Sequence, residues 1–147
     1  MTVETVASSE LFVCATLPTT NDAAGFGALS WVPVGEITDI PSVLGRTYNT
    51  STHAPIANAQ QIEKKASYKL GNADFTCGWD EDDAGQILIQ ALADHPSAIY
   101  AFKVVKQGGA MRYFTAQATG FQENMGTVDN VVQGKFTLLR QTDTIKA

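Results

Sequence analysis

The sequence predicts a mainly β fold, a β-sandwich or partial barrel of about six or seven strands with one flanking α-helix. Two observations support this class. Most of the 147 residues lie in short runs rich in β-branched and aromatic residues, separated by turn residues. Only one segment, about residues 81–94, has the apolar spacing of an amphipathic helix. The length predicts a single domain over residues 1–147.

The first third of the chain contains two expected strands. Residues 10–17 form an apolar run of β-formers, and the Pro, Asn and Gly residues of 18–27 predict turns after it. Residues 31–40 form the second run. Because Pro33 cannot donate a hydrogen bond to a neighbouring strand, we expect this strand at an edge or a bulge of the sheet.

The second half contains clearer strand signals. A strand is expected within residues 68–79, and residues 98–105 and 111–121 form a hairpin around a Gly-containing turn. Residues 131–140 form the last strand, and their alternation predicts one packed and one solvent-facing side. The packed side comprises Val132, Phe136 and Leu138, and the solvent-facing side comprises Gln133, Lys135 and Thr137.

Residues 45–67 fit neither pattern. These 23 residues are polar and small, and no period is sustained along them. A structureless loop of this length is uncommon inside a compact domain. The segment is therefore expected to be disordered, or to be a long extended arm that something outside its own fold orders. Tyr48, Pro55 and Ile56 would give such an arm a few apolar anchors.

Four consecutive acidic residues precede the expected helix, and we interpret them as its N-terminal cap. Asp80 is expected at the N-cap, with the others in the first turn, where they face free N–H groups and the positive end of the helix dipole. Residues 95–96, His-Pro, would end the helix. The capping residues are Asp80, Glu81, Asp82 and Asp83.

Spacing argues against a metal site in this run. A calcium-binding loop counted from Asp80 would need oxygen ligands at its fifth and twelfth positions, where Ala84 and Ala91 stand. His53 and His95 are isolated, and we expect them to be solvated or to cap a helix end. We therefore predict no catalytic residues, no metal and no cofactor.

Charge and composition restrict the partners. The net charge is −5, and the densest cationic stretch is only Lys64, Lys65 and Lys69, so a free-standing nucleic-acid binder is not expected. The sequence lacks an apolar run long enough to span a membrane and a signal-peptide pattern, so membrane insertion is not expected. Cys14 and Cys77 are expected to be buried free thiols.

The order of these features resembles the tail-tube (major tail) proteins of long-tailed bacteriophages, of the siphophage, lambda-like type. The resemblance covers residues 68–140 well and the first third only in general layout. It rests on a strand ending in an aromatic residue, an acidic-Gly helix start, a Tyr-x-Phe-Lys strand, a hairpin into a strand with Gly-Phe, and a final strand with spaced Val residues. These features lie at residues 75–79, 82–92, 100–104, 113–121 and 128–138.

The resemblance implies a structural virion protein that assembles into six-membered rings stacked into a hollow tube for viral DNA. It implies other tail proteins as partners (tape measure, tail tip and terminator), passage of DNA without specific binding, and a place in the virion tail after assembly in the host cytoplasm. The arm would then reach a neighbouring subunit. The arm residues expected at that contact are Tyr48, Asn49, His53, Pro55, Ile56, Gln60, Lys64 and Lys65.

Other functions remain open from the sequence. A tail terminator or head–tail connector would form a closed ring without polymerising. A small cytosolic β-barrel that binds a ligand would use aromatic residues to line a cavity. Candidates for that lining are Trp31, Trp79, Tyr100, Phe102 and Phe114. An enzyme using the acidic run would have to bind a divalent metal tightly.

Overall fold

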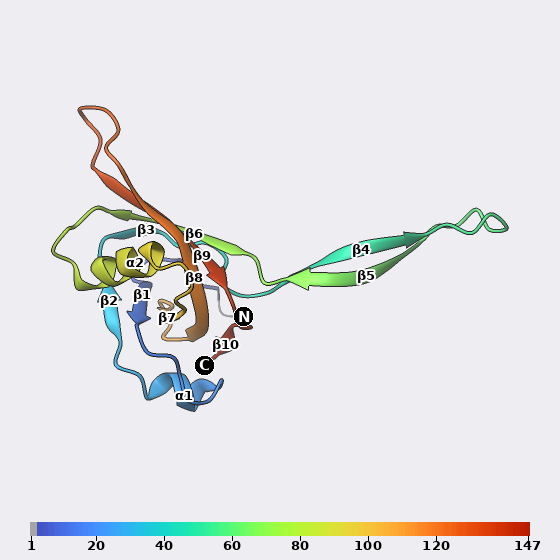
Figure 1. Ribbon diagram of the computed structural model, residues 1–147, viewed down its shortest axis with the longest axis horizontal. Helices are drawn as coiled ribbons and strands as arrows, with labels where there is room; N and C mark the ends of the chain where they lie inside the picture. The colour runs from blue at the N-terminus through green and yellow to red at the C-terminus, as the bar shows by residue number, and fades with distance from the viewer. Residues whose placement is uncertain (1–2) are drawn as a thin grey trace.

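The computed structural model describes residues 3–147, which form ten strands and two helices (Figure 1). The mainly β fold is confirmed, with more strands than the six or seven expected. In chain order the elements are β1 (Glu10–Cys14), α1 (Ala23–Gly27), β2 (Val32–Val34), β3 (Ile37–Asp39), β4 (Thr47–His53), β5 (Ile62–Lys69), β6 (Asn72–Gly78), α2 (Ala84–Asp94), β7 (Tyr100–Val105), β8 (Met111–Asn124), β9 (Gln133–Arg140) and β10 (Ile145–Lys146).

Eight strands form one antiparallel sheet in the order β2-β1-β7-β8-β9-β6-β3, and β10 pairs with the start of β8. Although β2 and β3 stand at opposite ends of this order, only Gly35 and Glu36 separate them in the chain. The sheet must therefore curl until its two ends approach each other, as in a partial barrel.

Two expected strands have different bounds in the structure. The single strand expected over residues 31–40 is wrong, because Glu36 has a φ of 62° and the left-handed turn there divides the segment into β2 and β3. The edge position expected for Pro33 is confirmed, since β2 ends the sheet. The first strand stops at Cys14 rather than at residue 17.

The predicted hairpin is confirmed as β7 and β8. Tyr100 pairs with Ala116 at one end of the hairpin, and Val105 pairs with Met111 beside the turn. β8 continues for 14 residues, and its register with β9 shifts between Ala118 and Gly120. In β9 the expected alternation is confirmed, because Phe136 and Leu138 are buried while Lys135 is exposed.

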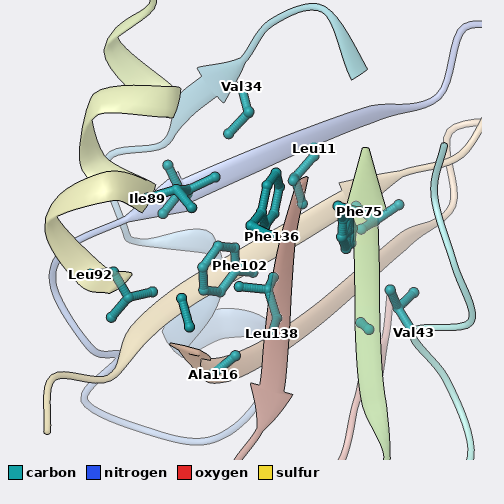
Figure 2. Packing of buried hydrophobic residues seen from close by; sticks show 14 of the residues in the cluster. Leu11, Val34, Val43, Phe75, Ile89, Leu92, Phe102, Ala116, Phe136 and Leu138 are labelled. Atoms are coloured by element: carbon teal, nitrogen blue, oxygen red, sulfur yellow. The ribbon is translucent and has the colours of Figure 1, made fainter. Parts of the chain in front are cut away.

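The main core lies between the curled sheet and α2 (Figure 2). Ile89 and Leu92 of the helix are fully buried and face aromatic side chains of the sheet, among them Phe102 and Phe136. The helix is confirmed, but the apolar stripe expected at Ala84, Ile87, Leu88, Ala91 and Leu92 is wrong in part. Leu92 is buried and Leu88 half-buried, whereas Ala84, Ile87 and Ala91 are exposed and Ile89 faces the core.

A smaller cluster lies under α1, a helix that the sequence reading placed among the turns. Asp22 caps α1 by accepting a hydrogen bond from the Gly25 amide at 2.7 Å, and Phe26 is fully buried against Tyr113. Five residues are too few to show helical periodicity, which explains why this helix was missed. Cys14 and Cys77 are buried free thiols, as predicted. No helix in residues 3–147 is long and apolar enough to cross a membrane.

Candidate assembly interface

β4 and β5 form a two-stranded hairpin that projects away from the rest of the molecule (Figure 1). We call residues 45–70 the arm and the remaining described residues the body. Every residue of both arm strands is exposed. The expected arm is therefore present as a segment, but the expectation that it lacks regular structure is wrong. Polar residues on both faces hide the alternation that would mark a strand.

Contacts within the arm are few and lie at the surface. The Tyr48 and Tyr68 rings are 5.3 Å apart, and the Lys65 ammonium lies 4.7 Å from the Tyr48 ring centroid. On the other face, the Asn49 amide donates to the Ser67 hydroxyl at 3.1 Å. An isolated two-stranded hairpin is marginally stable in water, so a surface outside the arm would add the stability that these contacts lack.

The structure distributes the predicted contact residues along the whole arm, and their contact with a neighbouring subunit stays a prediction. Ile56, in the loop at the tip, is fully exposed. On the strands lie Tyr48, Asn49, His53, Lys64 and Lys65, and in the tip loop lie Pro55, Ile56 and Gln60.

Arg140 of β9 clasps the base of the arm. Its guanidinium donates to the Val43 carbonyl at 2.8 Å and to the Gly45 carbonyl at 2.6 Å. Burial lowers the pKa of Arg140 below its ordinary value. Gly45 and Gly71, with φ of 102° and 92°, make the turns where the chain leaves and re-enters the body. The clasp therefore fixes the point from which the arm projects.

A second set of contacts supports this joint. Arg140 also donates to the Thr144 hydroxyl at 3.0 Å. The Arg46 side chain pairs with Asp143 at 2.5 Å, and its guanidinium lies 4.4 Å from the Tyr68 ring centroid. Sequence reasoning missed Arg140, although its place on the packed side of β9, in step with Phe136 and Leu138, was a usable signal.

At the opposite end of β6, the acidic run leads into α2, which begins at Ala84, not at residue 81. The predicted N-cap, Asp80, is wrong: Asp83 is the N-cap and accepts from the Gln86 amide at 3.0 Å, and none of the acidic residues lies in the first helical turn. The Asp80 carboxylate instead accepts from the Asp82 amide at 3.0 Å. This local hydrogen bond holds residues 80–83 in a turn and delays the helix.

Polar contacts join the start of α2 to both ends of the sheet. The buried Gln86 amide donates to the carbonyls of Gly35 at 3.2 Å and Gly78 at 2.8 Å, and the Asp83 carboxylate accepts from the Gly35 amide at 3.1 Å. Gly85 allows the close approach, because a Cβ there would lie 2.4 Å from the Pro33 carbonyl oxygen. These residues hold the two ends of the curled sheet together, so their polar groups have a structural role.

The other candidate sites have structural explanations. His95 caps the end of α2, where its Nδ1 accepts from the amides of Ser97 and Ala98 at 3.1 and 3.0 Å. Within residues 3–147, no three His, Cys, Asp or Glu side chains gather to hold a metal. Phe102 and Phe114, candidates for a ligand cavity, are fully buried and stack at 5.6 Å within the sheet's packing.

Comparison with solved structures relates this fold to components of contractile injection systems. A chain in the six-fold symmetrised baseplate of the anti-feeding prophage superimposes with a TM-score of 0.66 at 12% identity, covering 100% of this chain and 97% of that chain. A chain in the sheath/tube terminator of the extracellular contractile injection system PVC, in the extended state, gives 0.63 at 9% identity, with coverage of 100% and 98%.

A chain in the PVC sheath–tube complex, also in the extended state, gives a TM-score of 0.62 at 10% identity, covering 97% of this chain and 90% of that one. At such identities the likeness concerns the fold. No family model matches the sequence, and no curated protein matches it. Over nearly its whole length, the fold of this chain is thus similar to that of chains found in contractile injection systems.

Proposed function

We propose that this chain is a structural subunit of a phage-type tail that self-assembles into six-membered rings stacked into a hollow tube. In this role the tube conveys viral DNA. Its partners are other tail proteins: a tail tip from which the tube grows, a tape measure that sets its length, and a terminator that ends it. The net charge of −5 suits such a tube, because an acidic lumen repels phosphate and reduces binding to the DNA in transit.

The exposed arm carries this proposal. A hairpin exposed along both strands gains little by projecting into water, but it gains buried surface when a second subunit covers it. The full-length likeness to chains of injection machines supports the same role, and the sequence resemblance favours a long-tailed phage.

A terminator or baseplate ring is the second candidate, because two of the similar chains come from a sheath/tube terminator and a baseplate. Such a subunit would form closed rings, whereas a tube subunit needs a ring-to-ring contact that repeats without closing. The two candidates therefore differ in whether purified protein grows beyond one ring.

The test is electron microscopy of negatively stained, concentrated protein, together with size-exclusion chromatography. We expect hollow tubes with regularly spaced rings. Single rings of fixed size would favour the terminator or baseplate component, and a protein that stays monomeric at every concentration would count against both.

Deletion of residues 48–64 tests the arm directly. We expect the shortened protein to keep the body's circular-dichroism spectrum and cooperative unfolding, because no core residue lies in the deleted segment. It should form no tubes. Tubes formed by this variant at the wild-type concentration would show that the arm does not carry the assembly.

A further inference from the structure

Charge is divided unevenly between the arm and the body. The arm holds four of the ten cations and one of the fifteen anions, so its net charge is +3 and that of the remaining residues is −8. Its cations are Arg46, Lys64, Lys65 and Lys69. A basic hairpin on a strongly acidic body makes one copy electrostatically complementary to another.

Within the described part of the chain, three of these cations have no carboxylate partner. Among residues 3–147, ion pairs join Arg46 to Asp143 and Lys106 to Glu4, and none includes the arm lysines. Opposite Lys64 and Lys65 in the hairpin register stand Ser51 and Thr50, which are uncharged. The lysines are therefore free to pair with carboxylates of another molecule.

Carboxylates gather at the end of the body that lies farthest from the arm. We call Glu36, Asp80, Glu81 and Asp82 the acidic end; Glu36, Glu81 and Asp82 are exposed, and Asp80 is half-buried. The Glu36 carbonyl accepts from the Gly78 amide at 2.7 Å, which brings the β2–β3 turn beside the loop after β6. Figure 1 shows this loop and the arm projecting on opposite sides of the body, joined by β6.

We propose that the basic arm of one copy docks on the acidic end of the next copy, head to tail. The inference rests on the proposed function and names the surface that receives the arm. Because the donor and receiver surfaces lie at opposite ends of one molecule, the contact is heterologous and can repeat from copy to copy, as growth of a stack requires. The complementary charges also orient incoming subunits before contact.

A second copy suits the arm better than a nucleic acid does. Stable binding to DNA requires several phosphates to be neutralised, and among the described residues the arm offers only three unpaired lysines, with Glu63 beside Lys64. A second copy supplies carboxylate partners for these lysines and presents them on a protein surface.

The experiment compares two variants of the full-length chain that have the same net charge. Lys64→Glu with Lys65→Glu reverses the arm, and Lys135→Glu with Lys146→Glu reverses two exposed lysines of the body; each pair lowers the net charge from −5 to −9. Sedimentation velocity over a range of NaCl concentrations measures association. We expect the arm variant to associate at least about tenfold more weakly, and the body variant to change by less than about threefold.

A charge exchange identifies the receiving surface. Adding Glu81→Lys and Asp82→Lys to the arm variant returns the net charge to −5 and should restore association to near the wild-type level. Neither side chain caps α2, so the fold should tolerate both changes. Failure of this four-residue variant to recover, with its unfolding transition intact, would exclude the acidic end as the receiver.

Other outcomes separate this inference from the function on which it rests. One such result is association that is unchanged by NaCl and by the arm substitutions and yet is lost on deletion of residues 48–64. This result would overturn the charge contact but would still support the assembly role. Wild-type protein that never self-associates would overturn both. Binding of duplex DNA by the wild type, lost in the arm variant, would replace the second copy with a nucleic acid.

Discussion

The body and the arm each contain a pair of aromatic rings 5.3 Å apart, and burial is the main difference between them. Phe75 and Phe136 stack across β6 and β9 and are 1% and 2% exposed. Tyr48 and Tyr68 face each other across β4 and β5 and are 37% and 50% exposed. The free energy of such a contact follows the apolar area removed from water, so equal distances do not mean equal stabilisation.

This difference in burial suggests that the body provides the stability of the fold and the arm provides the contact with other subunits. The body buries its aromatic residues between the sheet and α2 and so supports its own fold (Figure 2). The arm exposes its aromatic and aliphatic side chains, including the fully exposed Ile56 at its tip. An assembly subunit benefits from this arrangement, because the arm can exchange water for a partner while the body stays folded.

The largest expected effect is a difference in stability when one ring of each pair is truncated to alanine. Phe136→Ala should lower the free energy of unfolding by about 3–5 kcal/mol, because it leaves a cavity between two stacked neighbours, Phe75 and Phe121. Tyr68→Ala should lower it by less than about 1 kcal/mol, because the ring is half exposed, yet it should weaken self-association. Urea denaturation of the monomeric protein measures the free energy of unfolding of both variants.

A more conservative substitution guards against complete loss of folding. Phe136→Leu keeps most of the volume and should cost less than Phe136→Ala while the order of effects stays the same. If Tyr68→Ala destabilised the protein as much as Phe136→Ala, the arm would be part of the cooperative fold, and its separation from the body would be incorrect.

A smaller effect is expected at the joint between the two regions. Arg140→Met should lower the free energy of unfolding by roughly 2–3 kcal/mol, because it removes charged hydrogen bonds to the carbonyls of Val43 and Gly45. Lys135→Met on the same strand is the control, since Lys135 is exposed and should change stability by less than about 0.5 kcal/mol.

Amide hydrogen exchange distinguishes a joint from an ordinary core residue. In Arg140→Met, the amides of residues 43–47 should exchange faster than those of α2, which begins at the opposite end of β6. Uniform acceleration across the body would mean that Arg140 supports the core in general and does not specifically hold the arm.

The difference in burial also explains which elements could be predicted from the sequence. The β7–β8 hairpin and β9 were predicted because one side of each strand is buried, which leaves an alternating pattern in the residues. The helix α2 was predicted from its apolar spacing, but its buried side was not, since Ile89 and not Ile87 faces the core. The arm was found only through the absence of such a pattern, and its two strands are visible in the structure alone.

The remaining misses come from contacts between segments distant in sequence. The first residue of α2 depends on how Asp80 and Asp83 share hydrogen bonds with Gln86 and with Gly35, 48 residues before Asp83. The clasp of Arg140 reaches carbonyls 95 and 97 residues away. Local propensity contains no information about such partners, so only the assembled sheet shows them.

The smallest expected effect concerns the pH dependence of the body. Cys77 is fully buried, and this burial raises the pKa of its thiol to about 11. Between pH 9 and pH 11 the unfolded chain loses this proton while the folded chain keeps it, so alkaline pH favours unfolding. The free energy of unfolding should fall with a slope of up to about 1.4 kcal/mol per pH unit from this group.

Cys77→Ala isolates that contribution from the other groups that titrate at alkaline pH. The variant should be less stable at pH 7, because a buried side chain becomes smaller, but its stability should fall less steeply than the wild type's from pH 9 to pH 10. Urea denaturation at pH 7, 9 and 10 gives the two slopes. Because the arm contains no cysteine, deletion of residues 48–64 should leave the difference between the slopes unchanged. Parallel slopes for wild type and Cys77→Ala would show that the thiol ionises as readily inside the body as in water.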